Sequence, residues 1–337
     1  MRKKAIISGA SLALLFTVSP VSAQENSSFT YVVQNNKNVV GGIYKSVPNK
    51  KETLLVKSGK SNFNKQVLAA QTVGKSLVYE KVTGRENLRS YYCDSELYKV
   101  DILSMTKGKT TKIATEYVPP KPTENMKVVG SSLYYVKYEN FKKDDSVFSV
   151  VKSDLTGKKK KTLMKGVKDF WIRDKSIFVI KNDKLQKMNL EGKNLQVIKS
   201  LKYDLFPTQS WCAGKNYNVS ENSLTVYDQL AEDRSDYKFM AYDFIKNKNT
   251  TLSFTFKIDD RNPLPENVNL EKKKMIIASL IPSTNYESKF NYNLYDFNGK
   301  KVKTLIKSVE KENIIYTDMS KGRILYKVGQ KLKLIKF

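Results

Sequence analysis

The acidic side chains are the groups in this sequence whose types and spacing come closest to supporting catalysis. The chain contains no His, which excludes Ser-His-Asp and Cys-His nucleophiles, His acid–base catalysis and His-ligated metals. Two Cys cannot form a structural zinc site alone. The Gly-containing segments 40–42 and 83–84 lack the spacing of a phosphate-binding loop. Carboxylate chemistry is therefore the remaining route to an enzyme.

Three groups of acidic residues are candidates for that chemistry: Asp144 with Asp145, Asp233 with Asp236, and Asp259 with Asp260. A glycosidase needs two carboxyl groups that face one sugar bond. Adjacent Asp residues in a strand point to opposite faces, and these pairs lie in polar, turn-like sequence. No segment matches the calcium-loop pattern either. We expect solvated loop charges and predict no catalytic residue, no cofactor and no metal site.

Aromatic residues offer a different kind of site, because they can stack against sugar rings or peptides. The candidates are Trp171, Trp211, Tyr91-Tyr92 and Tyr134-Tyr135, with Tyr98-Lys99 and Tyr138 as further Tyr positions near Lys. Alternate aromatic residues in strands usually pack between neighbouring sheets. We therefore expect most of them in the core.

The charge of the chain is strongly positive. Lys and Arg number 60 against 33 Asp and Glu, a net charge of +27, and most of the excess is Lys, as in Lys158–Lys161 and Lys272–Lys274. Such a surface attracts polyanions, and salt weakens the attraction. Because Arg is scarce and reads phosphate better than Lys, diffuse adhesion is favoured over a shaped phosphate site. The alternative is a solvated Lys-rich surface with no specific partner.

The N-terminus has the three parts of a secretory signal peptide. Arg2, Lys3 and Lys4 precede an apolar stretch that starts at Ala5, and small residues at 21–23 predict cleavage after Ala23. The apolar stretch is shorter than the about 20 residues that a membrane-spanning helix needs. We predict a signal peptide at 1–23, a single domain at 24–337, secretion, and no transmembrane segment after cleavage. Chromosomal nucleic acid is then not an available partner.

Export also bears on the two Cys residues, Cys93 and Cys212. Exported proteins can pair such residues in a disulfide, but the distance between these two cannot be deduced from sequence. A buried free thiol is the alternative, since small and apolar residues surround Cys212.

A turn motif repeats along the mature chain. It reads Asp154-Leu-Thr-Gly157-Lys158, Asn189-Leu-Glu-Gly192-Lys193 and Asp296-Phe-Asn-Gly299-Lys300, with a looser copy from Asp243 to Lys248. Asp or Asn at the first position can accept hydrogen bonds from the backbone ahead, and Gly at the fourth tolerates positive φ. The apolar residue after Asp or Asn is expected to anchor the hairpin.

Short β-rich segments repeat around these turns. One recurs as Ser76–Tyr79, Ser132–Tyr135, Ser176–Val179 and Arg323–Tyr326, and the next as Gly42–Ser46, Glu96–Val100, Ser146–Val150 and Phe290–Leu294. They define units near 29–60, 66–115, 124–165, 167–200, 206–258, 266–308 and 312–337. The first unit lacks its opening strand and the last stops after its third, which we interpret as ring closure, with the termini sharing a blade.

We therefore predict an all-β protein, a β-propeller of six or seven four-stranded antiparallel blades, with seven favoured. Two sandwiches or a solenoid are the alternatives. Sandwich strands need not repeat a turn motif at a fixed place, and solenoids with one strand per turn have shorter periods.

The repeated units resemble extracellular propeller domains of the DUF5050 type, and those of the low-density-lipoprotein-receptor and TolB types. The resemblance rests on the Tyr-containing strands and the Asp/Asn-Leu-x-Gly-Lys turn, and covers nearly all of the mature chain. The YWTD sequence of the receptor type is absent; Leu133–Val136 and Ile314–Asp318 come nearest. The resemblance implies the fold and transfers no functional residue.

The sequence thus favours an exported, non-enzymatic binding or scaffold module at the cell envelope, held in part by an anionic cell-wall polymer or glycan. A carboxylate-dependent carbohydrate-active enzyme is one alternative. The other is an accessory or sensor protein that binds a protein or peptide ligand.

Overall fold

The computed structural model describes residues 29–33, 41–46, 53–59, 66–89, 94–118, 125–139, 148–173, 175–200, 217–219, 223–229, 236–244, 246, 248–255, 261–269, 272–281, 289–310, 314–319, 322–328 and 331–337. The predicted signal peptide, Cys93 and Cys212 lie outside these residues. Among the described residues, no helix is long and apolar enough to cross a membrane.

The described strands form seven antiparallel sheets, each built from strands that are consecutive in the chain. The first three are β1 (Phe29–Val33), β2 (Gly42–Ser46) and β3 (Thr53–Lys57); β4 (Val67–Val73), β5 (Ser76–Arg89), β6 (Asp94–Thr106) and β7 (Lys109–Val118); and β8 (Met126–Val129), β9 (Ser132–Tyr138), β10 (Phe148–Asp154) and β11 (Lys161–Val167).

The next two sheets are β12 (Asp169–Arg173), β13 (Ser176–Lys181), β14 (Lys184–Asn189) and β15 (Gln196–Ser200); and β16 (Tyr217–Val219), β17 (Ser223–Gln229), β18 (Asp236–Asp243) and β19 (Lys248–Thr255). The last two are β20 (Arg261–Asn269), β21 (Lys274–Ile281), β22 (Lys289–Asp296) and β23 (Lys301–Glu310); and β24 (Ile314–Asp318), β25 (Arg323–Val328) and β26 (Lys331–Lys336).

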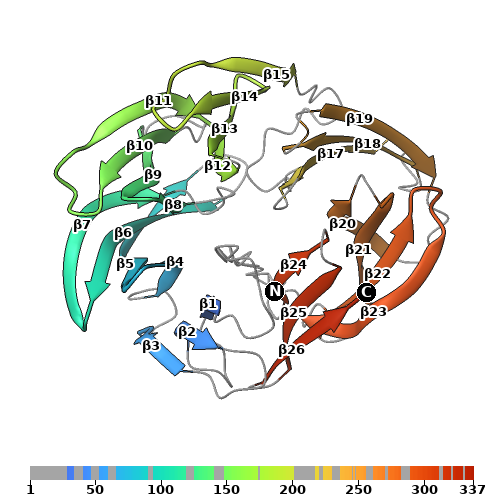
Figure 1. Ribbon diagram of the computed structural model, residues 1–337, viewed down its shortest axis with the longest axis horizontal. Helices are drawn as coiled ribbons and strands as arrows, with labels where there is room; N and C mark the ends of the chain where they lie inside the picture. Colours follow the sequence, from blue (N-terminus) through green and yellow to red (C-terminus); the bar gives the residue numbers. More distant parts are fainter. Residues whose placement is uncertain are drawn as a thin grey trace, which may run out of the picture.

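The seven sheets stand round a central axis, with the first strand of a sheet nearest the axis and its last strand at the rim (Figure 1). The chain is therefore a β-propeller with seven blades, numbered here in chain order. The prediction of an all-β propeller is confirmed, and the seven repeat units coincide with the seven blades. The first and last units have three described strands each, as the repeat indicated.

The prediction that the termini share one blade is wrong for the described residues. Strands β1–β3 and β24–β26 form separate sheets, and β1 pairs with β2 while β26 pairs with β25. Side chains connect the last blade to the first instead: Lys327 Nζ, from β25, lies 5.3 Å from the centre of the Tyr44 ring on β2. The repeat could reveal two incomplete sheets, but not whether they merge.

The second strand of a blade is buried on both faces, because a neighbouring blade covers each face. In β9, Leu133 to Val136 are buried in succession, and β13 has the same pattern from Ile177 to Ile180. Exposure is concentrated instead in the rim strands β11, β15 and β23. Exposed residues are therefore gathered mainly on whole strands at the rim of the disc.

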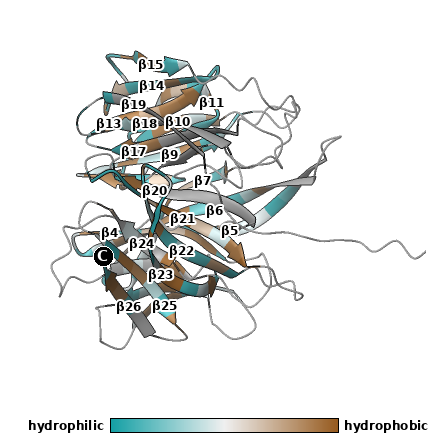
Figure 2. Cartoon of the chain, turned by 90° about the vertical axis from the view of Figure 1, so that its right-hand side faces the viewer, coloured by the Kyte–Doolittle hydropathy of each residue, from teal (hydrophilic) through white to brown (hydrophobic). Residues whose placement is uncertain are grey.

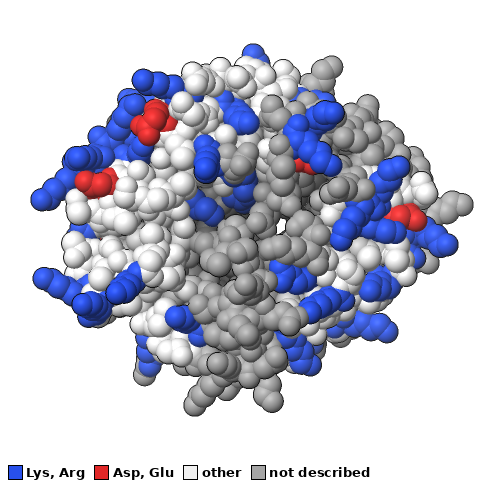
Figure 3. Space-filling view, in the orientation of Figure 1, with Lys and Arg blue, Asp and Glu red and all other residues white. Residues whose placement is uncertain are grey.

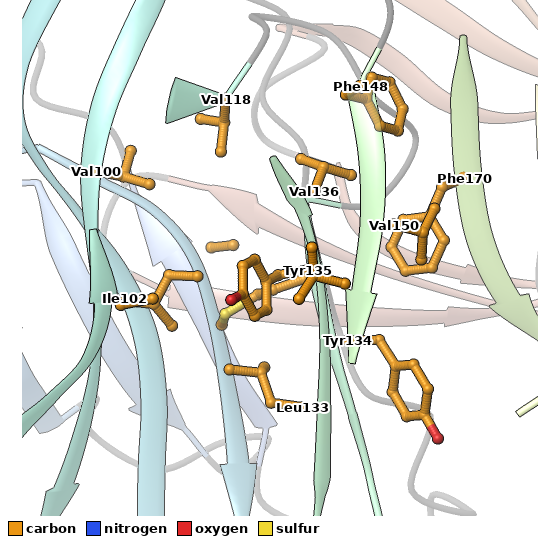
Figure 4. Packing of buried hydrophobic residues seen from close by; sticks show 14 of the residues in the cluster. Val100, Ile102, Val118, Leu133, Tyr134, Tyr135, Val136, Phe148, Val150 and Phe170 are labelled. Carbon is orange, nitrogen blue, oxygen red and sulfur yellow. The ribbon is translucent and has the colours of Figure 1, made fainter. Parts of the chain in front are cut away.

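The core lies between the blades. One cluster of buried residues runs from blade 2 through blade 3 into blade 4, and includes Val100, Tyr135, Val150 and Phe170 (Figure 4). Smaller clusters join blades 1 and 2, blades 4 and 5, and blades 6 and 7. Each inter-blade cluster is built largely from β-branched and aromatic side chains, which suit pleated surfaces packed against one another.

Blade 2 differs from the others in the length of its middle strands. β5 has 14 residues and β6 has 13, and their paired tips extend beyond the disc formed by the other blades (Figure 2). The OH of Tyr117, from β7, donates a 2.8 Å hydrogen bond to Glu86 on the extended part of β5. The fourth strand of blade 2 therefore contacts the base of the projecting hairpin.

Candidate functional site

The predicted acidic candidates fall almost entirely outside the described residues. This applies to Asp144, Asp145, Asp233, Asp259 and Asp260. Asp236 is the first residue of β18, where its backbone pairs with Thr255. Within the described residues, no group of three or more Cys, Asp or Glu side chains could hold a metal ion.

The aromatic candidates that the structure describes are core residues, as expected. Trp171 is fully buried and stacks on Phe178, with the ring centres 6.1 Å apart and the planes at 7°. Tyr242 and Phe244 of blade 5 complete this cluster between blades 4 and 5. Tyr134 and Tyr135 are buried between blades 2 and 4, and Tyr98 and Tyr138 are buried too. Trp211, Tyr91 and Tyr92 lie outside the described residues.

One buried carboxylate has an unusual environment. Glu80, on β5, has no exposed surface and lies on the same face of the strand as Val78 and Val82, which pack against blade 3. Its Oε2 accepts a 2.9 Å hydrogen bond from Nδ2 of Asn125, which precedes β8. Burial raises the pKa of Glu80 from 4.5 to about 7, although the bond from Asn125 opposes the shift. A carboxyl group therefore sits protonated or half-protonated at neutral pH between two blades.

The second oxygen atoms of this pair have no hydrogen-bond partner among the described residues: these are Oε1 of Glu80 and Oδ1 of Asn125. An acid and an amide joined by one N–H···O bond can form a second bond, O–H···O, when the acid is protonated. The protonated form of Glu80 is thus the form that fits the site. Because the pair is enclosed between blades, it holds the fold together and offers no open surface to a ligand.

A second carboxyl group lies nearer the surface. Glu116, on β7, is half-buried, and burial raises its pKa while Lys137 and Lys160 oppose the shift. Burial and the neighbouring Glu116 in turn raise the pKa of Tyr135. Glu116 and Glu80 lie on the same face of blade 2, on strands that are separated by β6. Because Glu80 is fully enclosed between blades, it offers no open surface at which the two carboxyl groups could act on a substrate.

The repeated turn has the hydrogen bonds and the glycine conformation that its residues predict. Oδ1 of Asp154 accepts hydrogen bonds from the backbone N–H groups of Thr156 and Lys158, both at 3.0 Å. Asn189 and Asp296 bind their turns in the same way, at 2.8–3.0 Å. The glycines at the fourth position, Gly157, Gly192 and Gly299, have φ between 74° and 76°. Gly is suited to this region of backbone space because it has no Cβ.

The turns also join one blade to the blade before it. A Cβ on Gly157 would lie 2.3 Å from the carbonyl oxygen of Ile113 on β7, and one on Gly192 would lie 3.2 Å from Leu163 on β11. The apolar residues Leu155 and Leu190 pack against the core, which confirms the predicted anchor. The copies in blades 3 and 4 thus make the same kind of contact with the preceding blade.

The lysines that follow these turns face solvent. Lys158, Lys159, Lys160, Lys193 and Lys300 are all exposed. The acidic groups beside them are already engaged: the hydroxyl of Thr156 and the turn backbone lower the pKa of Asp154, and Glu191 binds Lys152 at 2.5 Å. The Asp carboxylates therefore shape the turns, and the exposed lysines leave a positive surface.

Figure 3 shows the result on the face that it draws. Lys and Arg are spread over much of the described surface, and the few Asp and Glu are isolated among them. This basic surface is the candidate functional site. Lysine runs in the sequence predicted its charge, but its distribution over the blades required the fold.

Comparisons with known proteins assign no function to the chain. No family model matches the chain, and no curated protein matches it. Among solved structures, a chain of a Saccharomyces cerevisiae complex of Dbp5 with Nup159 and Gle1 is 12% identical over 96% of this chain and 89% of its own length, with a TM-score of 0.47. The N-terminal domain of Nup159 is 13% identical over 91% and 86%, with a TM-score of 0.44.

A GH74 xyloglucanase from Xanthomonas campestris is 9% identical over 91% of this chain and 50% of its own, with a TM-score of 0.46. These likenesses are too remote to indicate a partner or an activity for this chain. The chain is a β-propeller, and its resemblance to DUF5050-type proteins in particular stays a prediction.

Proposed function

We propose that this chain is an exported, non-enzymatic β-propeller that serves as a binding or scaffold module at the cell envelope, retained in part by electrostatic attraction to an anionic polymer. The observation that carries the proposal is the basic surface. Its exposed lysines follow rigid turns, and the carboxylates in those turns are bound to the turn backbone or to Lys152.

The propeller fold supports binding through these lysines, because its packed blades hold the lysine-bearing turns in fixed positions relative to one another. A Lys ammonium group is a compact, hydrated point charge and does not define a planar phosphate site as Arg does. The surface therefore suits a partner with many negative charges rather than one small anion. The sequence supports export through the signal peptide pattern at 1–23, which also makes envelope polymers the polyanions within reach.

The test uses the mature chain and a purified glycerol-phosphate polymer, with a neutral glucan as the matched control. We expect saturable binding to the anionic polymer at low salt and a steep loss of affinity as NaCl is raised, because counterions compete for the lysines. Binding that is equal for the neutral glucan, or that salt does not change, contradicts the proposal. Release of the protein from cell walls by moderate salt tests the same idea in place.

A further inference from the structure

The order of strands in a blade decides where the lysine-bearing turns lie. In a four-stranded antiparallel sheet with strands in chain order, the chain reverses at each turn. The turn between the first and second strands and the turn between the third and fourth therefore lie at the same end of the strands. In every complete blade both turns lie on one face of the disc, which we call the turn face.

The projecting hairpin of blade 2 marks the other face, because its tips join the second strand to the third. The C-terminus marks the turn face, because β26 is the third strand of its sheet. Figure 2 shows these two features on opposite sides of the disc. The side that carries the C-terminus is the one that Figure 3 presents to the viewer.

Lysines occupy the turn face in five consecutive blades. Exposed examples are Lys75 and Lys107 in blade 2, Lys159 in blade 3, Lys193 in blade 4, Lys246 in blade 5 and Lys300 in blade 6. None of these six is in an ion pair with a carboxylate from the described part of the chain. The two kinds of turn, which are far apart in each unit of sequence, thus contribute to a single arc of positive charge.

The apolar residues of these turns point away from a partner. Leu155 and Leu190 pack on the core between blades 2 and 4, and Phe244 is buried between blades 4 and 5. Insertion into a membrane needs an apolar surface, and tight protein interfaces usually contain aromatic anchors. The arc exposes lysines and buries its apolar residues. It therefore suits a hydrated polyanion better than a membrane or a tight protein interface.

We propose that the turn face is the binding surface, and that it takes a linear polymer with regularly spaced anionic groups, laid across the lysines of several blades. The inference rests on the proposed function and adds the location and form of the partner. A flexible chain can follow the curve of the arc. In blades 3 to 6, Asx hydrogen bonds fix the backbone of the turns that carry these charges.

The experiment compares two variants with the same change in charge. In the turn-face variant, Lys75, Lys159, Lys193 and Lys300 are replaced by Gln. In the control variant, Gln replaces four exposed lysines that lie toward the other ends of their strands, away from the turn face: Lys137, Lys165, Lys184 and Lys307. Circular dichroism and thermal unfolding establish that both variants are folded.

Binding is measured on the purified glycerol-phosphate polymer at several NaCl concentrations. We expect the turn-face variant to bind about tenfold more weakly or worse, with a shallower dependence of log Kd on log salt, because it releases fewer counterions. The control variant should lose about threefold or less. Anionic lipid vesicles and an acidic polypeptide are measured alongside.

The outcomes separate the two proposals. If the wild-type chain binds in a salt-dependent manner and both variants weaken equally, the proposed function survives and the turn face is overturned. If the wild-type chain binds no polyanion at low salt, the proposed function itself fails. Tighter binding to vesicles or to the acidic polypeptide than to the polymer overturns the assignment of a linear polymer.

Discussion

The side-chain amide of Gln71 in blade 2 forms two hydrogen bonds with the backbone of Val128 in blade 3. Its Oε1 accepts a 2.8 Å hydrogen bond from the N–H of Val128, and its Nε2 donates a 2.9 Å bond to the carbonyl oxygen of the same residue. Gln71 is on β4 and Val128 on β8, the innermost strands of blades 2 and 3. One amide side chain therefore satisfies both backbone groups of a residue in the neighbouring sheet.

Replacing Gln71 by Leu should destabilise the protein by about 3 kcal/mol, because it leaves a buried N–H and a buried C=O of Val128 without their partner. Urea unfolding gives the free energy. Gln196→Leu is the matched control, since Gln196 is exposed on the rim strand β15, and its effect should stay within about 0.5 kcal/mol. Equal effects at the two positions would show that the amide contributes nothing special.

The turn glycines provide a graded test of the inter-blade contact. Gly130, Gly192 and Gly157 all have positive φ, but a Cβ meets open space at Gly130, a Leu163 side chain at Gly192 and the Ile113 backbone oxygen at Gly157. Substitution by Ala should cost about 1 kcal/mol at Gly130, from backbone strain alone. It should cost more at Gly192, and about 3 kcal/mol or more at Gly157, where backbone must move.

Thermal unfolding of the three Ala variants measures this order. Because the glycines share the same region of φ, any difference among the variants reports the contact with the preceding blade. Three equal losses would mean that the turns do not press on the neighbouring blade, and that the motif serves its own hairpin only.

Features formed by residues close together in the chain could be predicted from the sequence. Asp154 and Gly157 are three residues apart, so the turn that they build could be predicted from the chemistry of Asx side chains and from the φ that Gly tolerates. The same reasoning found seven units, of which the first and the last have three described strands each. Burial of Trp171 was predictable too, because alternating aromatic residues in strands usually lie between sheets.

Contacts between blades could not be predicted, because they join residues that are distant in the chain. Gln71 and Val128 are 57 residues apart, and Glu80 and Asn125 are 45 apart. An acidic residue within the apolar segment 77–82 was the one available sign of a buried Glu80, but sequence could not name its partner. The shared blade was predicted wrongly because a repeat counts strands without showing which edges meet.

The closure between the last and first blades is testable at Lys327 and Tyr44. Lys327 is 6% exposed, so the attraction between its ammonium group and the Tyr44 ring operates away from water. A double-mutant cycle with Lys327→Met and Tyr44→Leu should give a coupling free energy of about 1–2 kcal/mol, because desolvation strengthens cation–π attraction. The cycle removes contributions that either side chain makes elsewhere.

The matched control is the pair Lys99 and Tyr117, where Nζ lies 5.8 Å from the ring centre but Lys99 is exposed. Its coupling should be about 0.5 kcal/mol, as for other exposed cation–π pairs. A closure coupling no larger than this would mean that Lys327 and Tyr44 do not hold the ring shut.

The buried acid Glu80 makes stability depend on pH in a defined direction. Its pKa is about 7 in the folded chain against 4.5 when solvated. Below pH 4.5 both states carry the proton and the group costs nothing through ionisation. Between pH 4.5 and 7 the unfolded chain releases the proton more readily than the folded chain, so the free energy of unfolding falls as pH rises, by on the order of 3 kcal/mol, and levels off above pH 7.

Glu80→Gln removes this ionisation and keeps a side chain that can hydrogen-bond with Asn125. Urea unfolding at a series of pH values should therefore show the variant gaining stability relative to the wild type as pH rises from 4.5 to 7, with a constant difference above it. Taking the difference cancels the titration of groups that both proteins share. A difference between wild type and Glu80→Gln that is flat across this range would mean that Glu80 ionises freely in the folded chain, and that no proton is held between blades 2 and 3.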